Sequence, residues 1–254
     1  TSSLVGSEMC IRDRMAEVIK VIGKNAFVQV FESTRGMRVG DEAEFEGHML
    51  EVTLGPGMLS RNYDGLQNDL DKMEGVFLRR GEYTFPLDND KLWDFKPLAK
   101  VGDKVAAGGW LGEVDENFQP HKIMVPFTFK GEYTVKSLKE AGQYTIGEVI
   151  AVLTDETGKD VEVTMIQRWP VKRAITCYKE KPRPYKLLET GVRTIDTVNP
   201  IVEGGTGFIP GPFGTGKTVL QHAISKQAEA DIVIIAACGE RANEVVEIFT
   251  EFPE

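Results

Sequence analysis

Eight consecutive residues carry a pattern of residue types that binds phosphate: Gly211, Pro212, Phe213, Gly214, Thr215, Gly216, Lys217 and Thr218. In the pattern G-x-x-x-x-G-K-T, glycines let the backbone curl so that successive N–H groups point at phosphate oxygens. Lys217 adds a positive charge for the β- and γ-phosphates, and the Thr218 hydroxyl is placed to ligate Mg²⁺. The helix expected from Thr218 and Val219 onward directs its positive dipole end at the same place. We therefore predict a loop that binds ATP or ADP together with Mg²⁺.

A second group of polar residues, Gly239-Glu240-Arg241-Ala242-Asn243-Glu244, directly follows the apolar run 232–237. The run predicts a central parallel strand buried on both faces. In parallel α/β sheets, chemistry collects at the carboxyl ends of the strands. Glu240 is therefore a candidate to polarise the water that attacks the γ-phosphate, and Arg241 to orient Glu240 or neutralise phosphate. The alternative is a solvated acidic helix start, because Glu is favoured near helix N-termini.

The elements that must position these groups follow an α/β pattern from Gly191 onward. A short strand is expected over 206–210, and apolar residues at helical spacing predict helices over 192–198, 218–228 and about 243–250. Residues 171–190 are basic and rich in proline, which is typical of a connector. We assign 171–254 to the N-terminal part of a P-loop nucleotide-binding domain.

The chain before residue 171 has the signals of β-structure. Short β-branched runs with a turn at 23–25 predict a partial N-terminal β-barrel over 15–70. Residues 71–170 have their own glycine and proline punctuation and predict an inserted β-rich domain. Residues 1–14 show no clear period, so we expect a disordered leader that is foreign to the fold.

Bulk composition narrows the function classes. The formal net charge is −9, which argues against a nucleic-acid partner. No apolar span of membrane length and no secretory signal are visible, so a cytoplasmic location is expected, with any membrane contact made through other subunits. The odd count of three cysteines predicts thiols in a reducing compartment. The three histidines, His48, His121 and His222, lack metal-ligand spacing and are expected to be surface or helix residues.

The segments GPFGTGKT (211–218), ACGERANE (237–244) and GVRTID (191–196), together with the inserted region, resemble the catalytic alpha subunits of V-type and A-type rotary ATPases. The resemblance covers 15–254, and Phe213 is typical of the A-type loop. It implies a multidomain fold: a partial β-barrel, a barrel-sandwich-like bulge domain and the start of a RecA-like α/β domain. Lys217 and Thr218 would bind phosphate and Mg²⁺, Glu240 would activate water, and Arg241 would lie at the γ-phosphate.

The resemblance also implies partners and a process. Three such alpha subunits would alternate with three B subunits in an A3B3 ring, with central rotor-stalk and peripheral-stalk subunits. ATP hydrolysis or synthesis would be coupled to H⁺ or Na⁺ movement across a membrane, and the sequence leaves the ion and the direction open.

Three other assignments are weighed against this one. A non-catalytic sister subunit lacks the catalytic Glu and often the loop Lys, whereas Lys217 and Glu240 are both present. An RNA-dependent hexameric translocase needs nucleic-acid-binding elements, and a secretion ATPase lacks the insertion at 71–170. The family continues into a Walker B strand, an adenine pocket and a helical domain beyond this sequence. We therefore expect an internal fragment that does not hydrolyse ATP at a useful rate alone.

Overall fold

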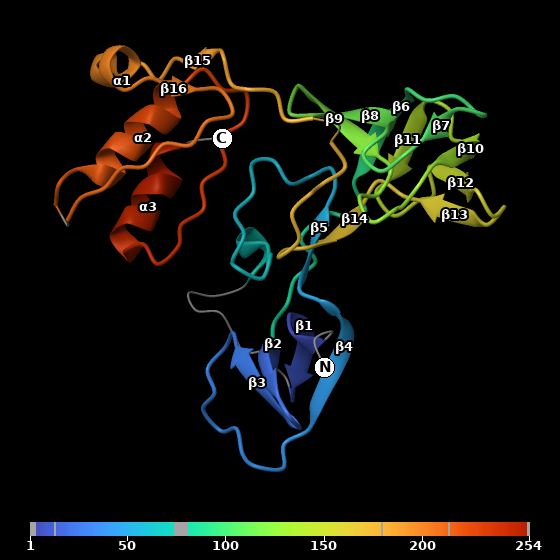
Figure 1. Ribbon diagram of the computed structural model, residues 1–254, viewed down its shortest axis with the longest axis horizontal. Helices are drawn as coiled ribbons and strands as arrows, with labels where there is room; N and C mark the ends of the chain where they lie inside the picture. The colour runs from blue at the N-terminus through green and yellow to red at the C-terminus, as the bar shows by residue number, and fades with distance from the viewer. Residues whose placement is uncertain (1–3, 13, 74–80, 179, 213, 253–254) are drawn as a thin grey trace. The chain divides into compact units, whose positions relative to one another are not determined.

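The computed structural model describes residues 4–12, 14–73, 81–178, 180–212 and 214–252, apart from the side chain of Glu251. The chain divides into two compact units, residues 1–178 and 179–254. Figure 1 shows that the first unit is built mainly of strands, whereas all three labelled helices belong to the second. Every helix in the described ranges is too short or too polar to cross a lipid bilayer.

The first unit begins with a four-stranded antiparallel sheet in the order β3-β2-β1-β4. Gly23, at a φ of 59°, makes the tight turn between β2 and β3. Met9, Ala16 and Val18 are buried on one face of the sheet. The sheet remains open in the described residues, so the barrel predicted for 15–70 is not closed here. The strands are β1 (Ser7–Ile11), β2 (Arg14–Ile22), β3 (Asn25–Val30) and β4 (Ala43–Met49).

The disordered leader expected over 1–14 is wrong from residue 7 onward among the residues described. Strand β1 lies between β2 and β4 and pairs with both. The side chain of Arg14 is only 1% exposed, and its Nε and Nη2 each donate to a backbone carbonyl, those of Ser33 and Arg35, at 3.0 Å. The polar residues Ser7 and Glu8 hide the strand alternation in the sequence, because their burial depends on neighbouring strands.

The rest of the first unit is a barrel-sandwich of short antiparallel strands. Two four-stranded sheets, β11-β6-β8-β9 and β13-β12-β10-β7, are accompanied by the pair β5–β14. The bounds are β5 (Glu51–Leu54), β6 (Leu92–Pro97), β7 (Lys104–Val105), β8 (Trp110–Glu116), β9 (Gln119–Met124), β10 (Tyr133–Leu138), β11 (Gly142–Thr145), β12 (Ala151–Asp155), β13 (Asp160–Val163) and β14 (Gln167–Pro170).

Two apolar clusters form the core of the barrel-sandwich. One gathers around Trp93 and Phe95, and the other around Leu111 and Leu153. Gly112 lies under the ring of Phe95, where an added Cβ would come within 2.2 Å of a ring carbon. Since real side-chain contacts are never that short, only glycine fits at this position of β8.

Glu116, at the end of β8, is a buried carboxylate with three polar neighbours. Its Oε1 accepts the backbone N–H groups of Gly57 at 2.7 Å and Leu59 at 3.0 Å, and its Oε2 lies 2.7 Å from Nδ1 of His121. Burial alone would raise the pKa of Glu116, but the hydrogen bonds from His121, Leu59 and Gly57 outweigh it and hold the pKa below its ordinary 4.5. The ionised carboxylate therefore stabilises the fold above the unfolded-state pKa, and this stabilisation is lost as the pH falls through the folded-state pKa.

Replacing Glu116 by Gln should lower the free energy of unfolding by about 1–3 kcal/mol near neutral pH, because an amide cannot accept at both ends. The difference from the wild type should shrink below about pH 4.5, where the wild-type carboxyl also becomes protonated. Urea unfolding at about pH 7 and about pH 3.5 measures both values. The control is Glu113→Gln on the same strand, which loses only a partly exposed pair with Lys122. A stability difference for Glu116→Gln that does not change with pH would contradict the assignment.

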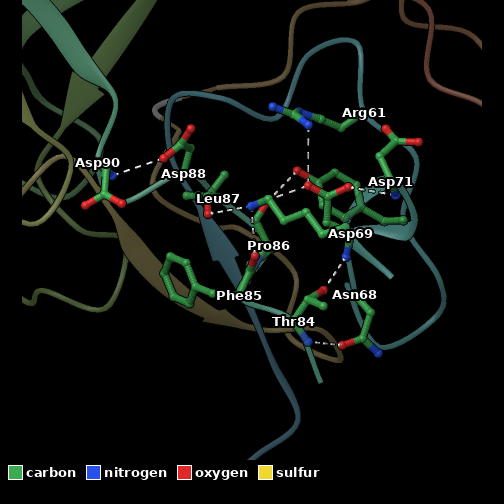
Figure 2. Close-up of polar contacts among 12 residues, drawn as sticks. Arg61, Asn68, Asp69, Asp71, Thr84, Phe85, Pro86, Leu87, Asp88 and Asp90 are labelled. Atoms are coloured by element: carbon green, nitrogen blue, oxygen red, sulfur yellow. Dashed lines mark hydrogen bonds and ion pairs between the residues drawn. The ribbon is translucent and has the colours of Figure 1, made fainter. Parts of the chain in front are cut away.

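A second buried carboxylate closes the loop that follows β5. Asp69 is fully buried, and its Oδ2 lies 3.5 Å from both Nη1 of Arg61 and Nζ of Lys72 (Figure 2). These distances are long for hydrogen bonds, and Oδ2 has no hydrogen-bond donor among the described residues, so charge attraction holds it. Oδ1 accepts the backbone N–H of Asp71 at 3.2 Å, at the start of a 3-10 turn over Leu70–Lys72.

The same loop is tied to residues 84–87. The backbone N–H of Asp69 donates to Oγ1 of Thr84 at 2.8 Å, and Nζ of Lys72 donates to the carbonyl of Leu87 at 3.0 Å (Figure 2). Leu87 is itself buried in the core cluster around Trp93. The Asp69 cluster therefore joins the loop 61–72 to the start of the barrel-sandwich.

Replacing Asp69 by Ala should destabilise the first unit by about 2 kcal/mol, because Arg61 and Lys72 lose their shared counter-charge and the Asp71 N–H loses its acceptor. The loss stays below that of a fully buried ion pair because the side chains of Arg61 and Lys72 are 35% and 38% exposed and can reach water. Chemical denaturation of the two proteins gives the value. The exposed Asp71→Ala should change stability by less than about 0.5 kcal/mol, and equal losses in the two variants would refute the role of Asp69.

The second unit contains three helices and one short strand pair. Strands β15 (Leu187–Leu188) and β16 (Ile201–Val202) pair in antiparallel fashion. The helices are α1 (Arg193–Val198), α2 (Lys217–Gln227) and α3 (Ala242–Glu251), close to the ranges that the apolar spacing predicts. Before α1, the N–H and hydroxyl of the buried Thr190 both donate to Oδ1 of Asp196, at 3.0 and 2.7 Å.

The two strands expected around the phosphate loop are not formed. Residues 206–210 and 232–237 have no strand hydrogen bonds in the described structure, and Phe208 and Ile234 are 86% and 89% exposed. The prediction of a buried central strand over 232–237 is therefore wrong here. An apolar run shows which surface favours burial, but a strand also needs a neighbouring strand to pair with.

Candidate functional site

The phosphate-binding pattern forms a turn that opens directly into α2. Gly214 and Gly216 lie in the left-handed region at φ values of 77° and 81°, which glycine adopts without strain. Gly216 is the N-cap of α2, and its carbonyl accepts the N–H of Leu220 at 2.9 Å. Lys217 and Thr218 therefore stand in the first helical turn, and Val219 follows them. Phe213 lies outside the described residues.

The lysine of the loop contacts the loop's own backbone. Nζ of Lys217 donates to the carbonyl oxygen of Gly211 at 2.6 Å, and Oγ1 of Thr215 donates to the carbonyl of Pro212 at 2.8 Å. The ammonium group thus lies beside the backbone that a phosphate would approach, next to the positive end of the α2 dipole. A bound phosphate would have to replace the Gly211 carbonyl as the partner of this ammonium group.

The first turns of α2 and α3 bring together two oxygen-bearing side chains. Oγ1 of Thr218 lies 3.5 Å from Oε2 of Glu244, the first acidic residue of α3. Hydroxyl and carboxylate oxygens are the donors that Mg²⁺ takes from proteins. The sequence analysis assigned no role to Glu244, although its place four residues after Glu240, one helical turn further on, was a usable signal.

Glu240 and Arg241 lie exposed just before α3. Arg241 is the N-cap of α3, and its carbonyl accepts the N–H of Val245 at 3.0 Å. No hydrogen bond or ion pair links Glu240 to the loop 211–218 within the described ranges. The structure thus joins Lys217 to Gly211 and Thr218 to Glu244, and it leaves Glu240 open to solvent near the same helix start.

A glycine turn that opens a helix with Lys and Thr in its first turn is the arrangement of P-loop nucleotide-binding domains. Three sequence models of one family match consecutive parts of the chain: the "ATP synthase alpha/beta family, beta-barrel domain" (7–47), the "ATPsynthase alpha/beta subunit barrel-sandwich domain" (84–172) and the "ATP synthase alpha/beta family, nucleotide-binding domain" (191–254). The chain belongs to the ATP synthase alpha/beta family.

Among curated proteins, the chain is similar to those named V-type ATP synthase alpha chain. It is 53% identical to that of Treponema denticola over 242 residues, which are 94% of this chain and 41% of the relative. It is 51% identical to that of Borrelia garinii subsp. bavariensis over 246 residues, and 48% identical to that of Protochlamydia amoebophila over 241 residues. These matches cover 96% and 94% of this chain and 43% and 40% of the relatives, so the chain spans about two-fifths of their length.

Proposed function

We propose that this chain carries the nucleotide-binding part of the catalytic subunit of a V/A-type rotary ATPase. The observation that carries the proposal is the pairing of a complete phosphate loop opening α2 with a Gly-Glu-Arg segment opening α3, joined by the contact between Thr218 and Glu244. The names of the similar alpha chains support the same assignment.

The roles of the site residues follow from their chemistry. The backbone N–H groups of 211–218 and the N-terminus of α2 bind the phosphates, and Lys217 neutralises the β- and γ-oxygens. Glu240 accepts a proton from the water that attacks the γ-phosphorus, so that ATP and water give ADP and phosphate. Arg241 balances negative charge at the γ-phosphate.

The residues present also fit a magnesium ion. The Thr218 hydroxyl and the Glu244 carboxylate, 3.5 Å apart, would hold it from the first turns of α2 and α3. Bound there, Mg²⁺ would neutralise charge on the β- and γ-phosphates. The loop residues keep the phosphate chain and the ion in one place.

We further propose that the complete subunit works in a ring with B subunits, an A3B3 arrangement around a rotor stalk with peripheral stalks. It would lie on the cytoplasmic side, peripheral to the membrane, and couple ATP turnover to H⁺ or Na⁺ movement. The excess of acidic residues, 39 against 30 basic residues, favours protein partners over nucleic acid.

The test is ATP-driven ion uptake by vesicles that carry the assembled complex with the complete subunit. The expected result is H⁺ or ²²Na⁺ accumulation that starts on ATP addition and collapses with an ionophore. ATP hydrolysis that proceeds without accumulation of either ion, in sealed vesicles, would rule out the rotary transport function and favour another ATPase of this fold.

A further inference from the structure

The position of Glu240 relative to the phosphate loop depends on how α3 packs. Residues 232–237, which precede the Gly-Glu-Arg segment, make no strand hydrogen bonds in the described structure. The segment leads directly into α3, with Arg241 as its N-cap. Whatever fixes α3 against α2 therefore also fixes Glu240, Arg241 and Glu244 beside the loop.

His222 makes such a contact from α2. It is 7% exposed and is the one buried residue of that helix, although the sequence predicts a surface or helix histidine. It stands one turn after Thr218, so the loop residue and the histidine lie on the same face of α2. Figure 1 shows α2 and α3 in the same unit, and the contacts below join them.

The partner of His222 is Phe252, the C-cap residue of α3. The two rings meet edge to face, with centroids 5.6 Å apart and an interplanar angle of 90°. Nζ of Lys226, one turn further along α2, lies 5.4 Å from the centroid of the same Phe252 ring. Two successive turns of α2 therefore hold the end of α3, while Thr218 meets Glu244 at its start.

We propose that His222 is a positioning residue: its packing on Phe252 sets the angle of α3 and thereby places the Glu244 carboxylate beside Thr218. The inference rests on the proposed function, because it gives His222 a role in the Mg²⁺-nucleotide site. His222 itself touches neither nucleotide nor metal. Its ring shape carries the effect, since an edge-to-face contact needs a planar ring and no particular charge.

The role predicts a specific division between two affinities. Phosphate binding by the loop depends on 211–218 and the start of α2, which His222 leaves intact. The additional affinity that Mg²⁺ gives to ATP depends on Glu244 reaching Thr218, which requires α3 in place. A residue that merely stabilised the unit would weaken both affinities together.

The experiment is equilibrium binding of ATP to the 254-residue chain, with and without excess Mg²⁺, measured by calorimetry. His222→Ala should keep the affinity for Mg²⁺-free ATP within about twofold, yet reduce the gain on Mg²⁺ addition about fivefold to tenfold, the range of one aromatic contact. His222→Phe should restore the gain, and Gln221→Ala, exposed on the same helix, should leave it unchanged. Phe252→Ala should repeat the loss, and it carries the test if His222→Ala does not fold.

The outcomes separate the inference from the proposed function. A full Mg²⁺-dependent gain in folded His222→Ala or Phe252→Ala, with ATP binding that still requires Lys217, overturns the role of His222 alone. Equal weakening of both affinities also overturns it, because that result reports a structural contribution. Failure of the wild-type chain to bind ATP overturns the proposed function and this inference together.

Discussion

Replacing Glu240 by Gln should lower the ATP turnover number of the assembled complex by about 10²- to 10⁴-fold, the usual contribution of a general base. The amide keeps the size of the side chain but cannot accept the proton of the attacking water. ATP affinity should remain close to that of the wild type, because Glu240 is exposed and makes no contact with the loop 211–218 in the described structure. The measurement is steady-state hydrolysis by the complex with the complete subunit, alongside nucleotide binding.

The control for this variant is Glu247→Gln on α3, which makes the same charge change on an exposed residue of the same helix. It should leave the turnover number within about twofold of the wild type, as expected for a surface position. If Glu240→Gln turned over ATP at the wild-type rate, the carboxylate would have to be assigned to the solvated start of α3, and another base would be required.

Replacing Lys217 by Ala should weaken ATP binding by about a hundredfold, which corresponds to about 3 kcal/mol for a charged hydrogen bond to phosphate. The ammonium group is the cation in the first turn of α2 and lies against the loop backbone, 2.6 Å from the Gly211 carbonyl. Its removal leaves the phosphate charge to the backbone N–H groups and the helix dipole. Titration of the chain with ATP measures the effect without any requirement for turnover.

Lys186→Ala is the matched control for Lys217→Ala. Lys186 belongs to the same unit and pairs at 2.7 Å with Glu203, both partly exposed. It changes the net charge by the same amount, so ATP affinity should remain within about twofold if local chemistry matters more than overall charge. A similar loss in both variants would mean that ATP senses the general field of the unit instead of a specific phosphate site.

The local features of the fold and site can be predicted from sequence because they depend on neighbouring residues. The loop 211–218 and the helix after it follow from glycines, Lys217 and apolar spacing over a few turns. The β2–β3 hairpin follows from β-branched runs on either side of Gly23. Each of these signals operates over fewer than about 15 residues, the range at which periodicity is informative.

Features set by distant parts of the chain cannot be predicted in this way. Strand β1 is ordered by pairing with β4, which lies far along the chain, and its own residues carry no clear alternation. Residues 232–237 have the apolar pattern of a strand but lack a paired neighbour in the described structure. The approach of Glu244 to Thr218 and the burial of His222 both depend on the packing of α3 against α2, which no local pattern encodes.

The hydrogen bond between Lys217 and the Gly211 carbonyl makes the loop its own tethered competitor. The carbonyl is held on the same short segment, so its effective concentration near the ammonium group is high and does not fall on dilution. The apparent affinity for nucleotide is reduced by the fraction of loops in this self-bonded state. The same carbonyl also receives the ammonium group when phosphate departs, which lowers the barrier to emptying the site. A loop of this kind favours rapid exchange of nucleotide over the tightest possible retention.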